Sequence, residues 1–285
     1  MRSGKFHQAV LVCEVIENLH IDNPASPAGR QARVIDATVG TGGHSVEMVK
    51  KGADVLGIEA DKEMIEIAQE RLKAKIVQGN FRNIDKIAAD NNFTEVDGVI
   101  FDLGISNLQL LSRERGFSFS NPDAPLDMRL DKDGQGVTAA DLLNGLREDQ
   151  LKKLFSVTLR PNQVNYLVKN ILLRRESKPF EEVGDLAKLC ASLKVKESLH
   201  PATLPFLALR MAVNSELENL QEALPKAFDL LKTGRRLLVI TFHSGEDKIV
   251  KSFFGKSGQI IFPGEIEINN NPGSRSAKLY VIEKK

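Results

Sequence analysis

Residues 34–45 have the sequence VIDATVGTGGHS, in which an apolar run passes directly into a turn with three glycines. The β-branched Val34 and Ile35 favour a buried strand, and the glycines allow backbone conformations that other residues rarely adopt. The segment after Gly43 has helical spacing, so the free N–H groups of a helix N-terminus would face whatever the turn binds. The stretch therefore predicts an α/β fold with a nucleotide-like ligand at this turn.

Strand-like and helix-like segments alternate over the first hundred residues, which predicts a doubly wound, Rossmann-like parallel sheet. Apolar runs rich in β-branched residues predict strands at 32–39, 54–60, 74–80, 96–106, 235–242, 259–262 and 277–285. Helical spacing occurs in the same parts of the chain at 9–19, 44–52, 61–73 and 245–255. These strands and helices lie within residues 9–106 and 235–285, on either side of the central part of the chain.

The alternation stops between residues 111 and 205, where helical patterns follow an irregular segment at 112–136. We therefore expect a discontinuous cofactor-binding domain, residues 1–110 and 206–285, interrupted by a helical insert at 111–205. A long amphipathic helix is expected over 204–231, with a break or a kink at Pro225 because proline cannot continue the helical hydrogen-bond pattern.

Composition narrows the class of protein. The net charge of +1 over 285 residues gives no bulk attraction for nucleic acid, although a local basic patch would suffice. The two cysteines, Cys13 and Cys190, form no disulfide framework or zinc motif, which is typical of a cytoplasmic protein. The apolar runs are too short for a membrane span, and the histidines show no metal-ligand spacing. We expect a cytoplasmic protein with no membrane contact and no metal.

The spacing of the glycine turn distinguishes between ligands. A dinucleotide fingerprint needs a third glycine where this chain has Ser45, which disfavours a dehydrogenase. The pattern Asp36-x-x-x-Gly40-x-Gly42 fits a class I methyltransferase that binds S-adenosyl-L-methionine (AdoMet). Glu59 ends the next strand, where a carboxylate can accept both ribose hydroxyls of such a cofactor.

Several segments together resemble the bacterial 16S ribosomal RNA cytosine-N4 methyltransferase family (RsmH/MraW). The resemblance runs from His7 to about Lys284. The matching segments are FHQAVLVCEVIENL, DATVGTGGHS, GNF at 79–81, DLGIS at 102–106, RGFSF at 115–119, PLDMRLD at 125–131, HPAT at 200–203, ALRMAVNSELENL, ITFHSGEDKIVKSFF and SRSAKL at 274–279.

The resemblance implies both a cofactor site and a target. The implied target is the N4 amine of a cytidine in the decoding centre of 16S rRNA, presented by the small ribosomal subunit and recognised by the helical insert. Whether the chain is a monomer or a homodimer is left open. The expected AdoMet-binding residues, with Gly40 added from the glycine motif, are Gly40, Gly42, Gly43, His44, Glu59, Phe81, Asp102 and Gln109.

Methyl transfer to an exocyclic amine requires alignment and an acceptor for the amine proton. Two candidates for this catalytic role are Ser106, which follows the fourth strand, and His243, which follows the fifth. The alternative role for His243 is a purely structural hydrogen bond, which is slightly favoured over a direct role. The reaction needs no metal.

Candidate substrate-binding residues lie in the insert. Phe117 and Phe119, beside Arg115 and Arg129, could stack a splayed base and hold phosphates, or could simply pin the irregular segment to the core. A basic run at 152–178, which includes Arg174 and Arg175, could bind the RNA backbone or form a solvated face.

Two alternative functions remain open. One is a non-catalytic AdoMet-binding ribosome assembly factor, and the other is an amino-methyltransferase acting on DNA or protein. The sequence DLGIS at 102–106 lacks the prolines and aromatic residue usual at this point in DNA amino-methyltransferases. That absence disfavours a DNA substrate of this type.

Overall fold

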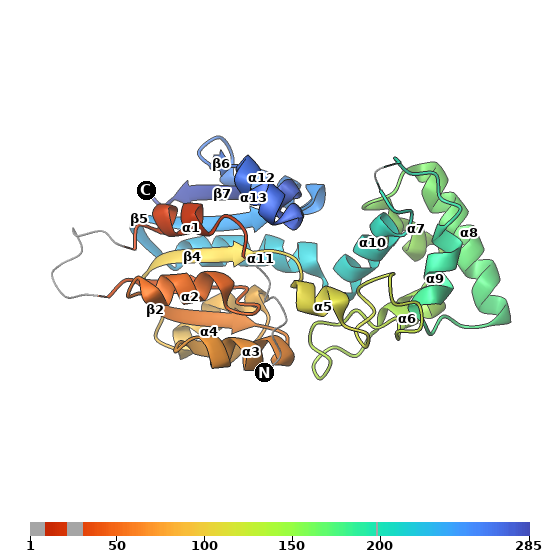
Figure 1. The fold of residues 1–285 in the computed structure, drawn as a ribbon, viewed down its shortest axis with the longest axis horizontal. Helices are drawn as coiled ribbons and strands as arrows, with labels where there is room; N and C mark the ends of the chain where they lie inside the picture. Colours follow the sequence, from red (N-terminus) through yellow and green to blue (C-terminus); the bar gives the residue numbers. More distant parts are fainter. Residues whose placement is uncertain (1–8, 22–30, 198) are drawn as a thin grey trace. The chain divides into compact units, whose positions relative to one another are not determined.

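The computed structural model describes residues 9–21, 31–197 and 199–285. His7, at the start of the family resemblance, lies outside these residues. The chain divides into two compact units (Figure 1). One unit comprises the residues up to Ser106 together with Leu217–Lys285, and the other comprises Asn107–Glu216.

The first unit contains one mixed sheet, so the expected α/β class is confirmed. Its strand order within the described residues is β3-β2-β1-β4-β5-β7-β6. The strand bounds are β1 Arg33–Asp36, β2 Asp54–Glu59, β3 Lys75–Gln78, β4 Val96–Asp102, β5 Leu231–Thr241, β6 Gln259–Ile261 and β7 Lys278–Glu283.

The sheet is parallel from β3 to β5, whereas β7 runs antiparallel to both β5 and β6. The parallel pairing expected from the alternation over the first hundred residues is confirmed for β1 to β4. No direction was predicted for β6 and β7, and their antiparallel pairing emerges only from the structure. All seven strand positions were predicted.

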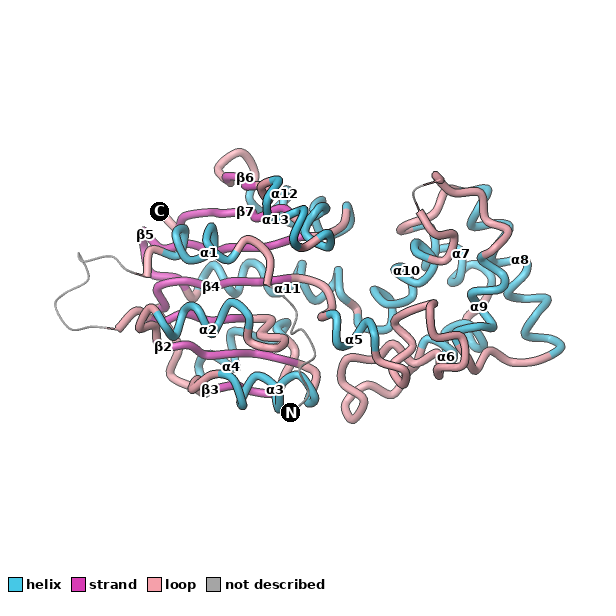
Figure 2. The backbone as a smooth tube through the Cα atoms, in the orientation of Figure 1, coloured by secondary structure: helices cyan, strands magenta, loops and turns pink. Residues whose placement is uncertain are grey.

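Helices cover both faces of this sheet (Figure 2). One face packs against α1, α2 and α3, and the opposite face packs against α4, α11 and α12. The helix bounds are α1 Val12–Leu19, α2 Gly43–Lys50, α3 Lys62–Arg71, α4 Ile84–Asp90, α11 Glu216–Asp229, α12 Ser244–Phe254 and α13 Glu265–Asn270.

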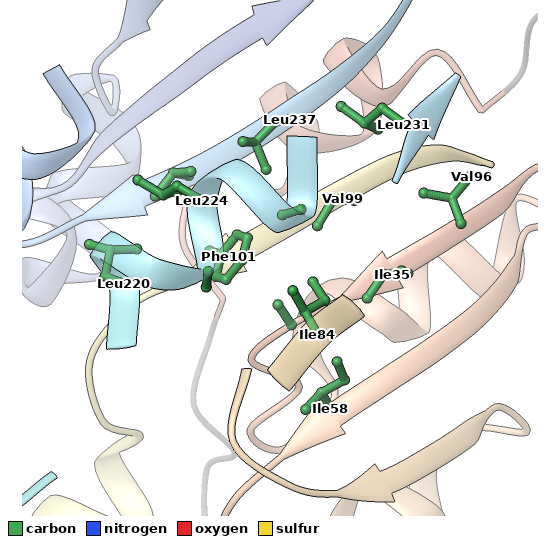
Figure 3. Close-up of a cluster of buried hydrophobic side chains, with 14 of the residues drawn as sticks. Ile35, Ile58, Ile84, Val96, Val99, Phe101, Leu220, Leu224, Leu231 and Leu237 are labelled. Carbon is green, nitrogen blue, oxygen red and sulfur yellow. The ribbon is translucent and has the colours of Figure 1, made fainter. Parts of the chain in front are cut away.

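Successive side chains along a strand point to opposite faces of the sheet and so belong to two different hydrophobic cores. Val99 and Phe101 of β4 pack with Leu224 of α11, whereas Ile100 between them belongs to the core on the other face (Figure 3). Phe101 is completely buried, as a central strand covered on both faces requires. The rigid centre of the sheet therefore determines where the carboxyl ends of β1, β2 and β4 lie.

The second unit is the helical insert. Its helices, in chain order, are α5 Asn107–Leu111, α6 Ala139–Gly145, α7 Glu148–Ser156, α8 Pro161–Ser177, α9 Val183–Cys190 and α10 Thr203–Asn214. A long loop at 112–138 precedes α6 and contains no helix or sheet strand. In neither unit do the described helices include one long and apolar enough to cross a membrane.

The boundaries of the insert differ from those expected. The structure places them at 106/107 and 216/217, not at 110/111 and 205/206. The second shift occurs because α10 packs with α6 and α7 and so belongs to the insert. The chain does not break at Pro225, which lies inside α11; the break comes earlier, where α10 ends at Asn214 and Ser215 adopts a left-handed conformation (φ 49°).

Candidate cofactor and substrate sites

Three carboxylates end three adjacent strands at one edge of the sheet. Asp36 ends β1, Glu59 ends β2 and Asp102 ends β4, and both neighbouring strands pair in parallel with β1. The carboxyl edge of such a sheet is where ligands of open α/β folds bind. The structure thus brings together Glu59 and Asp102, which the sequence assigned to the cofactor.

The glycine turn combines close packing with open space. Gly40 and Gly42 have positive φ angles of 53° and 83°. A Cβ on Gly42 would lie 2.4 Å from Leu72 Cδ2, and one on Gly43 would lie 2.7 Å from Ala9 Cβ. A Cβ on Gly40, in contrast, would approach only the Thr38 carbonyl oxygen, at 4.0 Å. Gly42 and Gly43 are therefore needed for packing, while Gly40 leaves room for a ligand to approach the backbone.

Glu59 holds the glycine turn in place. Its Oε2 accepts a hydrogen bond from the Gly40 N–H at 2.8 Å, and its Oε1 accepts one from the Asp61 N–H at 2.9 Å. Burial raises the pKa of Glu59 to about 7, although these two N–H groups favour the charged form. Each carboxylate oxygen has a second lone pair, so Glu59 can still accept a hydroxyl from a ligand.

Asp36 and Ser45 explain why the third glycine is absent. Ser45 Oγ donates to Asp36 Oδ2 at 2.6 Å, and both side chains are buried. Burial raises the pKa of Asp36, and this hydroxyl bond opposes the shift. Ser45 thus ties the first turn of α2 to the end of β1, a pairing that the motif spacing alone did not indicate.

His44 of α2 lies next to Asp102 at the end of β4. His44 Nδ1 lies 3.5 Å from Asp102 Oδ2, and Nε2 lies 2.9 Å from the carbonyl oxygen of Val10. Burial raises the pKa of Asp102 to about 6, while the charge interaction with His44 opposes that shift. Asp102 Oδ1 is buried without a hydrogen-bond partner among the described residues, so it can accept an N–H from a ligand.

Comparison with known proteins identifies the family to which this chain belongs. The profile of the MraW methylase family matches residues 4–285. The chain belongs to the MraW methylase family. The resemblance seen in the sequence is thereby confirmed, and the protein is a methyltransferase.

Relatives of this MraW methylase match over almost their full length. Ribosomal RNA small subunit methyltransferase H of Coprothermobacter proteolyticus is 39% identical and covers 98% of this chain and 96% of its own. The protein of the same name from Dictyoglomus thermophilum is also 39% identical, covering 98% and 97%. A solved rRNA methylase from Streptococcus thermophilus has a TM-score of 0.42 and 11% identity, and covers 89% of this chain and 87% of that one.

Two of the expected cofactor residues, Phe81 and Gln109, do not lie at the ends of β1, β2 or β4. Phe81 begins a short 3₁₀ helix after β3, and its ring packs edge-on against Phe101 with centroids 5.6 Å apart. Gln109 is buried on α5, in the insert unit. The contact of Gln109 with a cofactor stays a prediction.

The two catalytic candidates of the methylase have structural partners. Ser106 Oγ lies 3.3 Å from Met64 Sδ of α3. His243 precedes α12, and its Nδ1 accepts from the N–H groups of Gly245 at 3.2 Å and Glu246 at 3.4 Å. His243 thus caps a helix, and a direct role for either residue stays a prediction.

The loop candidates Arg115, Phe117 and Arg129 are built into the insert of the methylase. Arg115 is only 2% exposed and donates to the carbonyl oxygens of Arg129 and Leu130 at 2.9 and 3.0 Å. Phe117 is buried, and Arg129 forms a bidentate pair with Asp127 at 2.7 and 2.9 Å. These side chains hold the loop together, which favours the pinning interpretation over direct RNA contact.

The arginine pair of α8 is anchored in the same way. Arg174 pairs with Asp185 at 2.7 Å, and Arg175 donates to the carbonyl oxygens of Leu143 and Leu146 at 2.9 and 2.7 Å. Sequence spacing shows that these arginines are cationic but not which acceptors they reach. Cations of the basic run that are exposed instead are Lys153, Arg160, Lys169 and Lys178.

Proposed function

We propose that this MraW methylase uses AdoMet to methylate N4 of a cytidine in the decoding centre of 16S rRNA, within the small ribosomal subunit. The observation that carries the proposal is the edge formed by Gly40, Glu59 and Asp102 in a chain of this family. The names of the relatives, which specify small-subunit ribosomal RNA, support the same substrate class.

The edge fits AdoMet on the chemistry of its donors and acceptors. Glu59 would accept the ribose hydroxyls, and the open space over Gly40 would receive the backbone-facing part of the cofactor. The buried, unpaired Oδ1 of Asp102 would accept an amine N–H from the adenine or from the reacting base. AdoMet supplies a methyl group already activated on a sulfonium.

The chain itself must orient the target amine and exclude water. The lone pair of a cytosine amine is delocalised into the ring, so an acceptor that holds one N–H would help localise it. Asp102 Oδ1 at the end of β4 and the Ser106 hydroxyl just after it are the candidates for such an acceptor. Precise alignment supplies the rest of the rate enhancement.

The experiment is nucleoside mass spectrometry of small subunits taken from cells that lack this enzyme. Incubation with protein and AdoMet should produce N4-methylcytidine in 16S rRNA, and the Asp102→Ala variant should produce far less. DNA and total cell protein serve as substrate controls. Cofactor binding with no methylated product would favour the assembly-factor alternative, and product only in DNA or protein would exclude an RNA substrate.

A further inference from the structure

A ladder of three aromatic rings leads from the core of the insert to its surface. Phe206 of α10 is buried and meets Phe119 edge-on, with centroids 5.7 Å apart and planes at 83°. Phe119 in turn stacks on His200 at 4.2 Å, with planes only 7° apart. His200 is exposed, so the ladder ends at the surface with a ring that has one face on Phe119.

A hydrogen bond from the backbone limits how the His200 ring can rotate. Its Nδ1 accepts a hydrogen bond from the Ala202 N–H at 3.2 Å, just before α10 begins. Because Nδ1 is the acceptor, the neutral ring carries its proton on Nε2. The ring is therefore held by stacking and by a hydrogen bond before any ligand arrives, which lowers the entropy cost of binding.

We propose that the free face of His200 is a stacking platform for an unpaired nucleobase of the RNA substrate. The inference rests on the proposed function, because it names where the substrate of that reaction is gripped. Base stacking on an aromatic ring tolerates any base, so the platform would hold a nucleotide of the substrate without selecting its identity.

This assignment differs from the one expected from sequence, and burial is the reason. Phe117 and Arg115 are 5% and 2% exposed, so neither can stack on a base as the loop stands. Phe119 acts from behind, as the support of His200. The segment before α8 contacts the start of α10, because Thr158 Oγ1 donates to the Leu204 carbonyl oxygen at 2.9 Å, and the exposed cation Arg160 follows two residues later on that segment.

Two substitutions at His200 separate stacking from capping. His200→Asn keeps a side-chain acceptor for the Ala202 N–H and removes the ring, whereas His200→Phe keeps the ring and removes the acceptor. Tyr166→Asn on α8 removes another exposed ring of the insert and is the matched control. The measurements are KM and kcat with small subunits, AdoMet affinity by calorimetry, and thermal unfolding.

The platform predicts a roughly 5- to 100-fold rise in KM for small subunits in His200→Asn, the range expected for one lost base stack. In His200→Asn, kcat and AdoMet affinity should stay near the wild-type values. In His200→Phe, the KM for small subunits should lie close to that of the wild type. An unchanged KM in a folded His200→Asn protein would overturn the proposal, as would a loss in His200→Phe alone. If wild-type protein bound AdoMet but methylated no subunits, the proposed function itself would fail.

Discussion

The imidazole of His44 bridges the N-terminal part of the chain and the end of β4, with Nε2 2.9 Å from the Val10 carbonyl oxygen and Nδ1 3.5 Å from Asp102 Oδ2. A carbonyl oxygen can only accept, so Nε2 carries a proton in this arrangement. Nδ1, the other ring nitrogen, then faces the Asp102 carboxylate. This pair links the position of the loop before α1 to the charge on Asp102.

We expect AdoMet affinity to rise with pH as Asp102 ionises, since the charged carboxylate is the better acceptor. The pKa of Asp102 is raised to about 6 by burial and by Asp36 and Glu246, while His44 lowers it. In His44→Gln the lowering charge is lost, so the midpoint should move to higher pH. Calorimetric titration of AdoMet from pH 5 to 8 measures this. A midpoint that does not move would show that His44 does not control Asp102.

The Glu59→Ala substitution should weaken AdoMet binding by roughly 10- to 100-fold. Hydrogen bonds to a charged acceptor contribute about 1.5–3 kcal/mol each, and 1.4 kcal/mol corresponds to a tenfold change. The ribose is remote from the transferred methyl, so KM for AdoMet should rise while kcat at saturation is largely retained. Glu59→Asp should give an intermediate loss. Equal affinities of mutant and wild type would remove Glu59 from the cofactor site.

Glu59 should also make the stability of the ligand-free protein depend on pH. Its pKa is raised from 4.5 to about 7 on folding, so the folded chain binds a proton that the unfolded chain releases. Stability is therefore greatest below pH 4.5 as far as this group is concerned, and falls as pH rises to about 7. Thermal unfolding between pH 5 and 8 should show a smaller decline in Glu59→Ala. An equal decline would assign the effect to other groups.

The exposed cations of the insert should bind RNA, whereas Arg175 should stabilise the insert. A triple variant with Lys153, Arg160 and Lys169 changed to alanine should raise KM for small subunits and flatten its salt dependence, with little change in Tm. Arg175→Ala should lower the stability of the insert by about 1–3 kcal/mol, because two carbonyl oxygens lose a charged donor. The reverse pattern, with stability lost only in the triple variant, would contradict this division.

The target should be methylated faster in an assembled particle than in free RNA. A net charge of +1 leaves the protein little non-specific affinity for the RNA backbone, so recognition must rely on the shape of the presented site. Initial rates on small subunits and on deproteinised 16S rRNA at equal concentration test this. Equal rates on the two substrates would refute it.

The sequence by itself determined the strands and the family of this protein. Local patterns were sufficient for all seven strands, because short β-branched runs between turns favour the extended conformation. The spacing of Gly40, Glu59 and Asp102 along successive strands also predicted a common edge, since the carboxyl ends of parallel strands meet there.

Only the tertiary structure decided which side chains are free to bind. Arg115, Arg174 and Arg175 look alike in sequence as RNA-binding cations, yet each donates to an acceptor within the insert that lies 11 to 32 residues away along the chain. Such pairings depend on long-range packing, which no local pattern encodes. The same holds for His200, whose ring becomes a platform only because Phe119, 81 residues earlier in the sequence, packs behind it.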